Sequence, residues 1–324
     1  MLSQKTFAHY PDNQQRTLRE LSLQLYSEQQ RQWPMLADGV AALRFVRIRD
    51  LDCGPFTVRL QYNPRRIVST AANVDAVSVK ARRCFLCLEN LPLEQSGIVY
   101  REKFLLLCNP MPVFKEHFTI SHIDHIPQSI EEKILSLLSL AKDLSPEYSV
   151  FYNGPACGAS APDHMHFQAA PMGEIPAERE VGDRLKLFKR SGGAVFSTVE
   201  HYGRSVMVLD SDNEKTMELA FLRMCSSMRK VMKTADEPMM NVIGSYADGM
   251  WRLIVFVRRK HRPSVYFKTG EDKIIISPAA VDIGGLVVTP MEKDFHSVDA
   301  SMITSIFEEV SVTQETLVSI LDAL

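Results

Sequence analysis

Hydrophobic positions along the chain recur with two different periods, and stretches with the two periods alternate. Apolar residues at every third or fourth position are typical of helices that bury one face, whereas short alternating or continuous apolar runs are typical of strands. The pattern predicts helices over 13–32, 128–143 and 213–234, and from Val298 to the end. It predicts strands over 56–66 (breaking at Asn63-Pro64), three within 97–123, and one each over 148–153, 204–210, 240–246, 251–260 and 284–290.

The order of these elements predicts an α+β fold with two related lobes. In each half, helix lies between strands that look antiparallel, so we expect each lobe to be an antiparallel sheet with flanking helices. We place the lobes at residues 1–172 and 173–324, with an approximate boundary. The methionine-rich stripe of the helix over 213–234 is expected to pack in the core.

Composition narrows the class of protein without naming a function. The 324 residues are 45% hydrophobic and 23% charged, enough for one large core or two ordinary ones. A net charge of −2 with no asymmetry of charge sign along the chain argues against a nucleic-acid surface. We find no secretory signal and no apolar run of membrane-spanning length, and six cysteines in a chain of this size do not suggest a disulfide framework. These features predict a soluble cytoplasmic protein.

The segment YNGPACGASAPDHMHFQAA, over 152–170, is the most informative part of the chain. A loop of small residues leads into His164-x-His166-x-Gln168. Extended backbone would place these three side chains on one face, roughly 6–7 Å apart. Two imidazoles and a carboxamide would then converge on whatever the loop holds. The plainer alternative is a half-buried strand whose histidines are satisfied by hydrogen bonds.

The residue types in this segment suit chemistry on a phosphate. Neutral imidazole is a good nucleophile near pH 7, and the nitrogen–phosphorus bond that it forms is labile. Gln168 does not titrate, but its amide can donate to a phosphate oxygen as charge builds there. Asn153, Gly158 and Ser160 are candidates for phosphate contact, because glycine admits close backbone approach and a hydroxyl adds a donor. Without the histidines, such a run would be merely a loop.

A C-x2-C pair, Cys84 and Cys87, predicts a metal site. No thioredoxin-like context surrounds it, so zinc is favoured over redox chemistry. A tetrahedral site needs two further ligands, which His117, His122, His125 and His164 could supply. We choose His125 and His164, since zinc on His164 would lock the neighbouring strand and orient His166. The site would then be closed and structural. The alternative is two ordinary buried cysteines.

Two basic clusters are weaker candidates. Arg65 and Arg66 follow the turn at Asn63-Pro64 and are able to grip a phosphate, although adjacent arginines on a turn are usually solvated. The cluster over 258–262 reads RRKHR, and we interpret it as either an anion-binding rim or a solvated strand end.

The sequence resembles the histidine-triad superfamily, specifically its transferase branch. The resemblance rests on YNGPACGASAPDHMHFQA, on Cys84-x2-Cys87 and on NPMPVFKEHFTISHIDHIPQ over 109–128. It is strong over about 60–170 and faint beyond 200. Members include galactose-1-phosphate uridylyltransferase, diadenosine tetraphosphate phosphorylase and GDP-hexose phosphorylases. The resemblance implies two histidine-triad-like lobes.

The resemblance also implies roles for single residues. His166 matches the nucleophile that forms a covalent nucleotidyl-histidine, and Gln168 matches the residue that marks transferases and phosphorylases rather than hydrolases. Asn153 and Ser160 match residues that contact phosphates. The zinc ligands of those members that bind zinc are matched by Cys84, Cys87, His125 and His164.

The substrate implied is a nucleoside-diphosphate sugar or a dinucleoside polyphosphate, with phosphate or a sugar phosphate as acceptor. A homodimer is a further expectation, because relatives share active sites between subunits. The sequence leaves the nucleobase and the acceptor open. Two alternatives remain, a hydrolase of the same fold and a nucleotide-binding regulatory protein that does not turn over.

Overall fold

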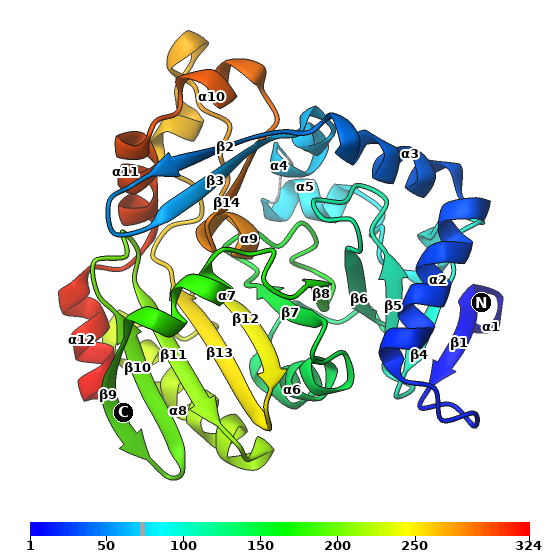
Figure 1. Ribbon diagram of the computed structural model, residues 1–324, viewed down its shortest axis with the longest axis horizontal. Helices are drawn as coiled ribbons and strands as arrows, with labels where there is room; N and C mark the ends of the chain where they lie inside the picture. Colours follow the sequence, from blue (N-terminus) through cyan, green and yellow to red (C-terminus); the bar gives the residue numbers. More distant parts are fainter. Residues whose placement is uncertain (72–74) are drawn as a thin grey trace.

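A single mixed sheet of eleven strands runs through both halves of the chain in the computed structural model, which describes residues 1–71 and 75–324 (Figure 1). Its first-half strands, in spatial order, are β1 (Thr6–Tyr10), β4 (Gly97–Tyr100), β5 (Phe104–Cys108), β6 (Phe118–His122), β8 (His166–Pro171) and β7 (Tyr148–Asn153). The second-half strands continue as β12 (Met240–Ala247), β13 (Met250–Val257), β11 (Val206–Ser211), β10 (Ala194–Val199) and β9 (Leu185–Ser191).

The two halves meet where β7 pairs with β12. This pairing is antiparallel and aligns Tyr152 with Val242 and Val150 with Gly244. All other neighbours in the large sheet are also antiparallel except β1 and β4. The predicted α+β class with flanked antiparallel sheets is confirmed, and the sheets of the two lobes are continuous with each other.

Helices from both halves cover one face of this sheet. They are α2 (Leu18–Gln32), α3 (Pro34–Ala42), α6 (Ile134–Asp143), α8 (Glu214–Met232) and α12 (Gln314–Asp322). Helix α8 begins where the Asn213 side chain accepts a hydrogen bond from the backbone N–H of Thr216. Its last turn contains Arg229 and Lys230, whose positive charges suit the carbonyl end of a helix. Its methionine stripe, including Met217 and Met224, is fully buried against the strands. The prediction of core packing is confirmed.

The opposite face of the second-half strands carries a smaller sheet, formed by β2 (Arg47–Asp52), β3 (Thr57–Tyr62) and β14 (Leu286–Thr289) (Figure 1). Strand β3 pairs antiparallel with β2 and parallel with β14, and Val58 and Leu60 pack into the core beneath. The surrounding helices are α7 (Ala177–Glu180), α9 (Ala280–Ile283), α10 (Glu292–Ser297) and α11 (Ala300–Val310). An early part of the chain thus packs with its last third.

Most predicted elements are present at or near their expected positions. The strand over 56–66 ends at Tyr62 and runs into a single helical turn over Pro64–Arg66, as the Asn63-Pro64 break predicts. The sequence pattern did not identify β1, β2, β9 or β10. Strand β9 lies at the sheet edge with most of its residues exposed, so it lacks the alternation that marks a half-buried strand.

The remaining short helices are α1 (Leu2–Lys5), α4 (Ile67–Thr70) and α5 (Ala76–Ala81). Among the described residues, no helix combines the length and apolar character needed to cross a membrane.

Arg258, the first residue of the basic cluster over 258–262, is fully buried. Its guanidinium donates to the Asn241 side chain and to the backbone carbonyls of Pro278 and His261, the latter two at 2.9 and 3.0 Å. Both interpretations of this residue, an anion-binding rim and a solvated strand end, are therefore wrong. The cation ties the end of β13 to the segment that leads into α9, and a buried charge persists here because carbonyl and amide oxygens surround it.

Replacing Arg258 by Met should lower the free energy of unfolding by about 3 kcal/mol or more, because several buried acceptors lose their donor. Arg259→Met is the matched control, since Arg259 is exposed and its side chain donates to the carbonyls of Glu308 and Glu309 at the surface. That change should cost less than about 1 kcal/mol. Urea denaturation of both variants measures the difference. Equal losses would contradict the structural role assigned to the buried cation.

Candidate functional site

Four predicted ligands of a metal ion converge behind the start of β8. One ligand atom from each of Cys84, Cys87, His125 and His164 lies within 4.8 Å of the other three. The Nδ1 atom of His164 is 3.2 Å from Cys84 Sγ, and the Nδ1 atom of His125 is 3.2 Å from Cys87 Sγ. These separations are compatible with the edges of a tetrahedral site with two sulfur and two nitrogen ligands. The structure therefore brings the predicted set together.

The protonation of His164 suits ligation. Its Nε2–H donates to the backbone carbonyl of His122 at 2.8 Å, so the proton sits on Nε2 and the Nδ1 lone pair faces the cysteines. Asp163 lies 3.6 Å from the Nε2 of His125, which is within ion-pair range but beyond hydrogen-bond distance. Burial and the neighbouring Cys84 thiol raise the pKa of Cys87 to about 12. A pair of thiolates here consequently requires a cation, which is what a metal ion would supply.

His164 differs from expectation in one respect. Strand β8 begins only at His166, so His164 does not lie on the strand with His166 and Gln168. The backbone N–H of His164 bonds the carbonyl of Ala161 at 3.2 Å, which closes a turn ahead of the strand. That turn is what delivers its ring to the cysteines.

His166 is 3% exposed and is oriented by its neighbour. Its Nδ1–H donates to the backbone carbonyl of His164 at 2.8 Å, so the proton is on Nδ1 and Nε2 keeps a free lone pair. Burial lowers the pKa of His166 to about 4. The imidazole is thus neutral near pH 7, and the lone pair of its Nε2 is not protonated.

Gln168 is oriented by His117, which the sequence analysis considered only as a metal ligand. The Nδ1 atom of His117 accepts from the backbone N–H of Val113 at 3.2 Å, so its proton must be on Nε2. That proton is donated to Gln168 Oε1 at 2.9 Å. Because the carbonyl end of the carboxamide is occupied, its NH2 end is the part left to donate to a ligand. The turn at Asn109-Pro110, which precedes His117, is the sequence feature from which this residue could have been identified.

The glycine loop is held by the second half of the chain. The side-chain oxygen of Asn153 accepts from Asn241 Nδ2 at 2.9 Å and from the backbone N–H of Ala280 at 2.7 Å. Gly158 has a φ of +110°, and a Cβ there would lie 2.7 Å from the Cβ of Ala279. Ser160 is half-buried, and its carbonyl accepts from Arg82. Asn153 therefore has only its NH2 group left to offer a phosphate.

The two arginines after β3 point to different places. Arg66 donates to the carbonyl of Met111 at 2.7 Å, and its charge contributes, after burial, to lowering the pKa of His117 to about 3. Arg65 is exposed and lines a pocket of about 450 Å³ together with Tyr62 and Phe45. The structure therefore does not arrange the pair around one phosphate.

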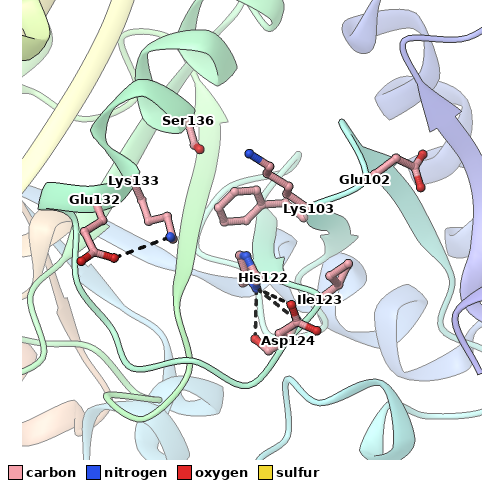
Figure 2. Close-up of a pocket in the computed structure, with 9 residues that line it drawn as sticks. Glu102, Lys103, His122, Ile123, Asp124, Glu132, Lys133 and Ser136 are labelled. Atoms are coloured by element: carbon pink, nitrogen blue, oxygen red, sulfur yellow. Dashed lines mark hydrogen bonds and ion pairs between the residues drawn. The ribbon is translucent and has the colours of Figure 1, made fainter.

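A second pocket, of about 270 Å³, is lined by residues that include His122 and Asp124. Figure 2 shows the side chains of Lys103, Lys133 and His122 around it. The backbone carbonyl of His122, a residue of this pocket, also accepts from His164 Nε2–H. Carboxylates such as Asp124 line it as well as the lysines, and none of the predicted site residues does.

Two family models match successive parts of the chain. Residues 25–171 match a family described as a domain of unknown function (DUF4922), and residues 178–321 match the GDPGP1-like C-terminal domain. A galactose-1-phosphate uridylyltransferase from Caldanaerobacter subterraneus subsp. tengcongensis is 29% identical over 119 residues, which cover 30% of this chain. The match spans only about a fifth (22%) of that relative's own length.

Among solved structures, yeast Ap4A phosphorylase Apa2 in complex with AMP has a TM-score of 0.59 at 16% identity, covering 90% of this chain and 96% of that one. The same enzyme in complex with Ap4A has a TM-score of 0.59 at 14% identity, covering 89% and 97%. At such identities the likeness shows the fold. Together these matches confirm the resemblance to the transferase branch of the histidine-triad superfamily.

Burial of neutral His117 makes stability depend on pH. Its pKa of about 3 in the folded chain lies below the ordinary value of 6.5, so between these values the unfolded chain binds a proton that the folded chain does not. Stability therefore falls as pH falls through this window, by about 2 kcal/mol between pH 6.5 and 4.5 from this residue. His117→Asn should remove that part of the slope in urea denaturation. The exposed His201→Asn is the control, and a slope unchanged by His117→Asn would contradict the expectation.

Proposed function

We propose that this chain is a nucleotidyltransferase of the phosphorylase or uridylyltransferase type, with His166 as the nucleophile. The observation that carries the proposal is the pairing of two fixed groups on β8. His166 has its Nδ1 proton held by the His164 carbonyl, and Gln168 has its carboxamide oxygen held by His117. His166 thus keeps the lone pair of Nε2 for attack on phosphorus, and Gln168 keeps its NH2 group to donate to a phosphate oxygen.

The reaction proceeds in two displacements. His166 Nε2 attacks the α-phosphorus of a nucleoside-diphosphate sugar or a dinucleoside polyphosphate, and the bond to the bridging oxygen breaks with its electron pair leaving on the departing phosphate. An oxygen of inorganic phosphate or a sugar phosphate then attacks the same phosphorus. The nitrogen–phosphorus bond breaks, and the electron pair returns to His166.

Each fixed group has a role in these steps. The carbonyl of His164 stabilises positive charge on the imidazole while nitrogen is bonded to phosphorus. The amide of Gln168 donates to a non-bridging oxygen as negative charge develops there. Gln168 also supports transfer over hydrolysis, because a carboxamide does not titrate and so cannot act as a general base that activates water. The similar proteins described above, a uridylyltransferase and a phosphorylase, are both group-transfer enzymes.

We further propose that the cluster of Cys84, Cys87, His125 and His164 holds zinc in a structural role. Two sulfur and two nitrogen ligands are the donor set that zinc prefers. With all four positions filled by protein, the ion has no open site for substrate. Its ligand His164 supplies the carbonyl that orients His166, so the ion would stiffen the segment just before the nucleophile.

Replacing His166 by Asn should abolish an acid-labile covalent adduct formed from nucleotide labelled at the α-phosphate. His9→Asn is the control, since that imidazole is half-exposed and pairs with Glu102 far along the chain. Adduct formation in the His9 variant should equal that of the wild type. Persistence of the adduct in His166→Asn would refute the assignment.

The acceptor distinguishes transfer from hydrolysis in the same assay. Chase of the wild-type adduct with phosphate or a sugar phosphate should release a nucleoside diphosphate or a nucleotide sugar. Release at the same rate in buffer without either acceptor would instead support a hydrolase. Tight nucleotide binding with no adduct would support the regulatory alternative.

Elemental analysis of protein never exposed to chelator should find close to one zinc ion per chain. Cys87→Ser should lose tightly held metal and cost more than about 2 kcal/mol of stability, because a structural ion contributes directly to folding. Cys53→Ser is the control, since Cys53 is half-buried and lies outside the cluster. Clearly substoichiometric metal in the wild type would contradict the four-ligand site.

A further inference from the structure

Strands β7 and β8 separate just where the nucleophile lies. Their regular pairing runs from Tyr148 opposite Pro171 to Phe151 opposite Gln168 and then ends. Strand β7 nevertheless continues to Asn153, and β8 already begins at His166. The glycine loop starts at this point. The backbone N–H and C=O groups at the ends of β7 and β8 that face each other therefore need hydrogen-bond partners other than the opposite strand.

The side chain of Gln128 fills this gap. Its Nε2 donates to the carbonyl of Asn153 at 2.9 Å and to the carbonyl of His166 at 3.1 Å. Its Oε1 accepts from the backbone N–H of His166 at 2.8 Å. The residue is 3% exposed, so water does not compete for these groups. A carboxamide offers a donor and an acceptor together, as a peptide group does, and this one replaces a missing peptide between the two strands.

Gln128 is itself fixed in place. Its backbone N–H bonds the carbonyl of Pro162 at 3.2 Å. Two residues later, the backbone N–H of Ile130 donates to Glu237 at 2.7 Å, and the same carboxylate accepts from the hydroxyl of Tyr152 at 2.6 Å. The side chain therefore reaches the gap from a segment that is anchored on both sides.

We propose that Gln128 is a positioning residue for the nucleophile. Its side chain bonds the backbone N–H and the backbone carbonyl of His166, which both point toward β7. On the other side of His166 lies β6, with Ser121 opposite. The ring position of His166, and hence its hydrogen bond to the His164 carbonyl, depends on that backbone. Gln128 touches no reacting atom. Its effect on rate rests on the proposed function, whereas its effect on the geometry of His166 does not.

Two substitutions of Gln128 remove hydrogen bonds while keeping the volume of the side chain nearly constant. Gln128→Met is close to isosteric and removes all three bonds. Gln128→Glu keeps the volume and the acceptor for the His166 N–H, but a carboxyl group donates at most one hydrogen bond when protonated and none when ionised, whereas the amide donates to both carbonyls. Gln95→Met is the matched control, because Gln95 is also buried and its amide donates to the carbonyl of Cys108 at 3.2 Å.

The first readout does not involve catalysis. Nitrogen-15 spectra of histidine-labelled protein report which ring nitrogen carries the proton, and His166→Asn identifies the His166 signals. The wild type and Gln95→Met should show His166 protonated at Nδ1 alone. Both Gln128 variants should show a mixture of the two neutral forms, because the His164 carbonyl is no longer reliably placed.

The second readout is single-turnover formation of the covalent adduct. Both Gln128 variants should slow this step about tenfold to a hundredfold, as expected when a reacting group is misplaced by a fraction of an ångström to about 1 Å. KM should change less than about threefold. Among the predicted phosphate-binding residues, the Gln128 side chain is bonded to Asn153, and there only to the backbone carbonyl. Gln95→Met should keep the wild-type rate.

The outcomes are separable. Unchanged proton placement on His166 and a rate within about twofold of wild type, in a folded Gln128 variant, would overturn the proposal. If Gln128→Met does not fold, the same two measurements on Gln128→Glu decide. If the wild type forms no adduct, the proposed function fails, but the nitrogen-15 comparison still tests whether Gln128 positions His166.

Discussion

The pairing of β7 with β12 is the contact on which the rest of the structure depends. It joins the sheets of the two halves, and it ends at the residue pair Asn153 and Asn241. The Asn241 side chain donates to Asn153 and to the carbonyl of Cys157 at 2.7 Å, while buried Arg258 donates to Asn241. The glycine loop of the first half is therefore anchored to a cation of the second. Neither half alone would complete the site.

Backbone groups, rather than charged side chains, set the chemistry of the histidines. The carbonyl of His122 fixes the proton of His164, the carbonyl of His164 fixes that of His166, and the N–H of Val113 fixes that of His117. Each imidazole is buried enough to stay neutral, so one nitrogen donates and the other is free for a separate role. Which nitrogen of each ring donates, and which keeps a free lone pair, follows from where the backbone places one proton on each ring.

The sequence was sufficient where residue type and local spacing carry the signal. Cys84-x2-Cys87 and His164-x-His166-x-Gln168 were recognisable because few other functions need those residues at that spacing. It was insufficient where partners are distant along the chain. The pairing of β3 with β14 joins residues more than 200 positions apart, and the burial of Arg258 depends on carbonyls from other segments. Arg65 and Arg66 were adjacent in sequence, but one turn of helix sends them to different surroundings.

The glycines of the loop show why a motif alone does not establish a phosphate site. A Cβ at Gly154 would lie 2.8 Å from Cys157 Sγ and 2.9 Å from the carbonyl of Met240, and one at Gly158 would meet Ala279. Both positions need glycine for packing against the second half, whether or not a phosphate approaches. Tight contact with the segments around Met240 and Ala279 fixes the loop in either case. Changes in the second half would thus move the loop, which is a physical route by which that half can affect the segment that leads to His164 and His166.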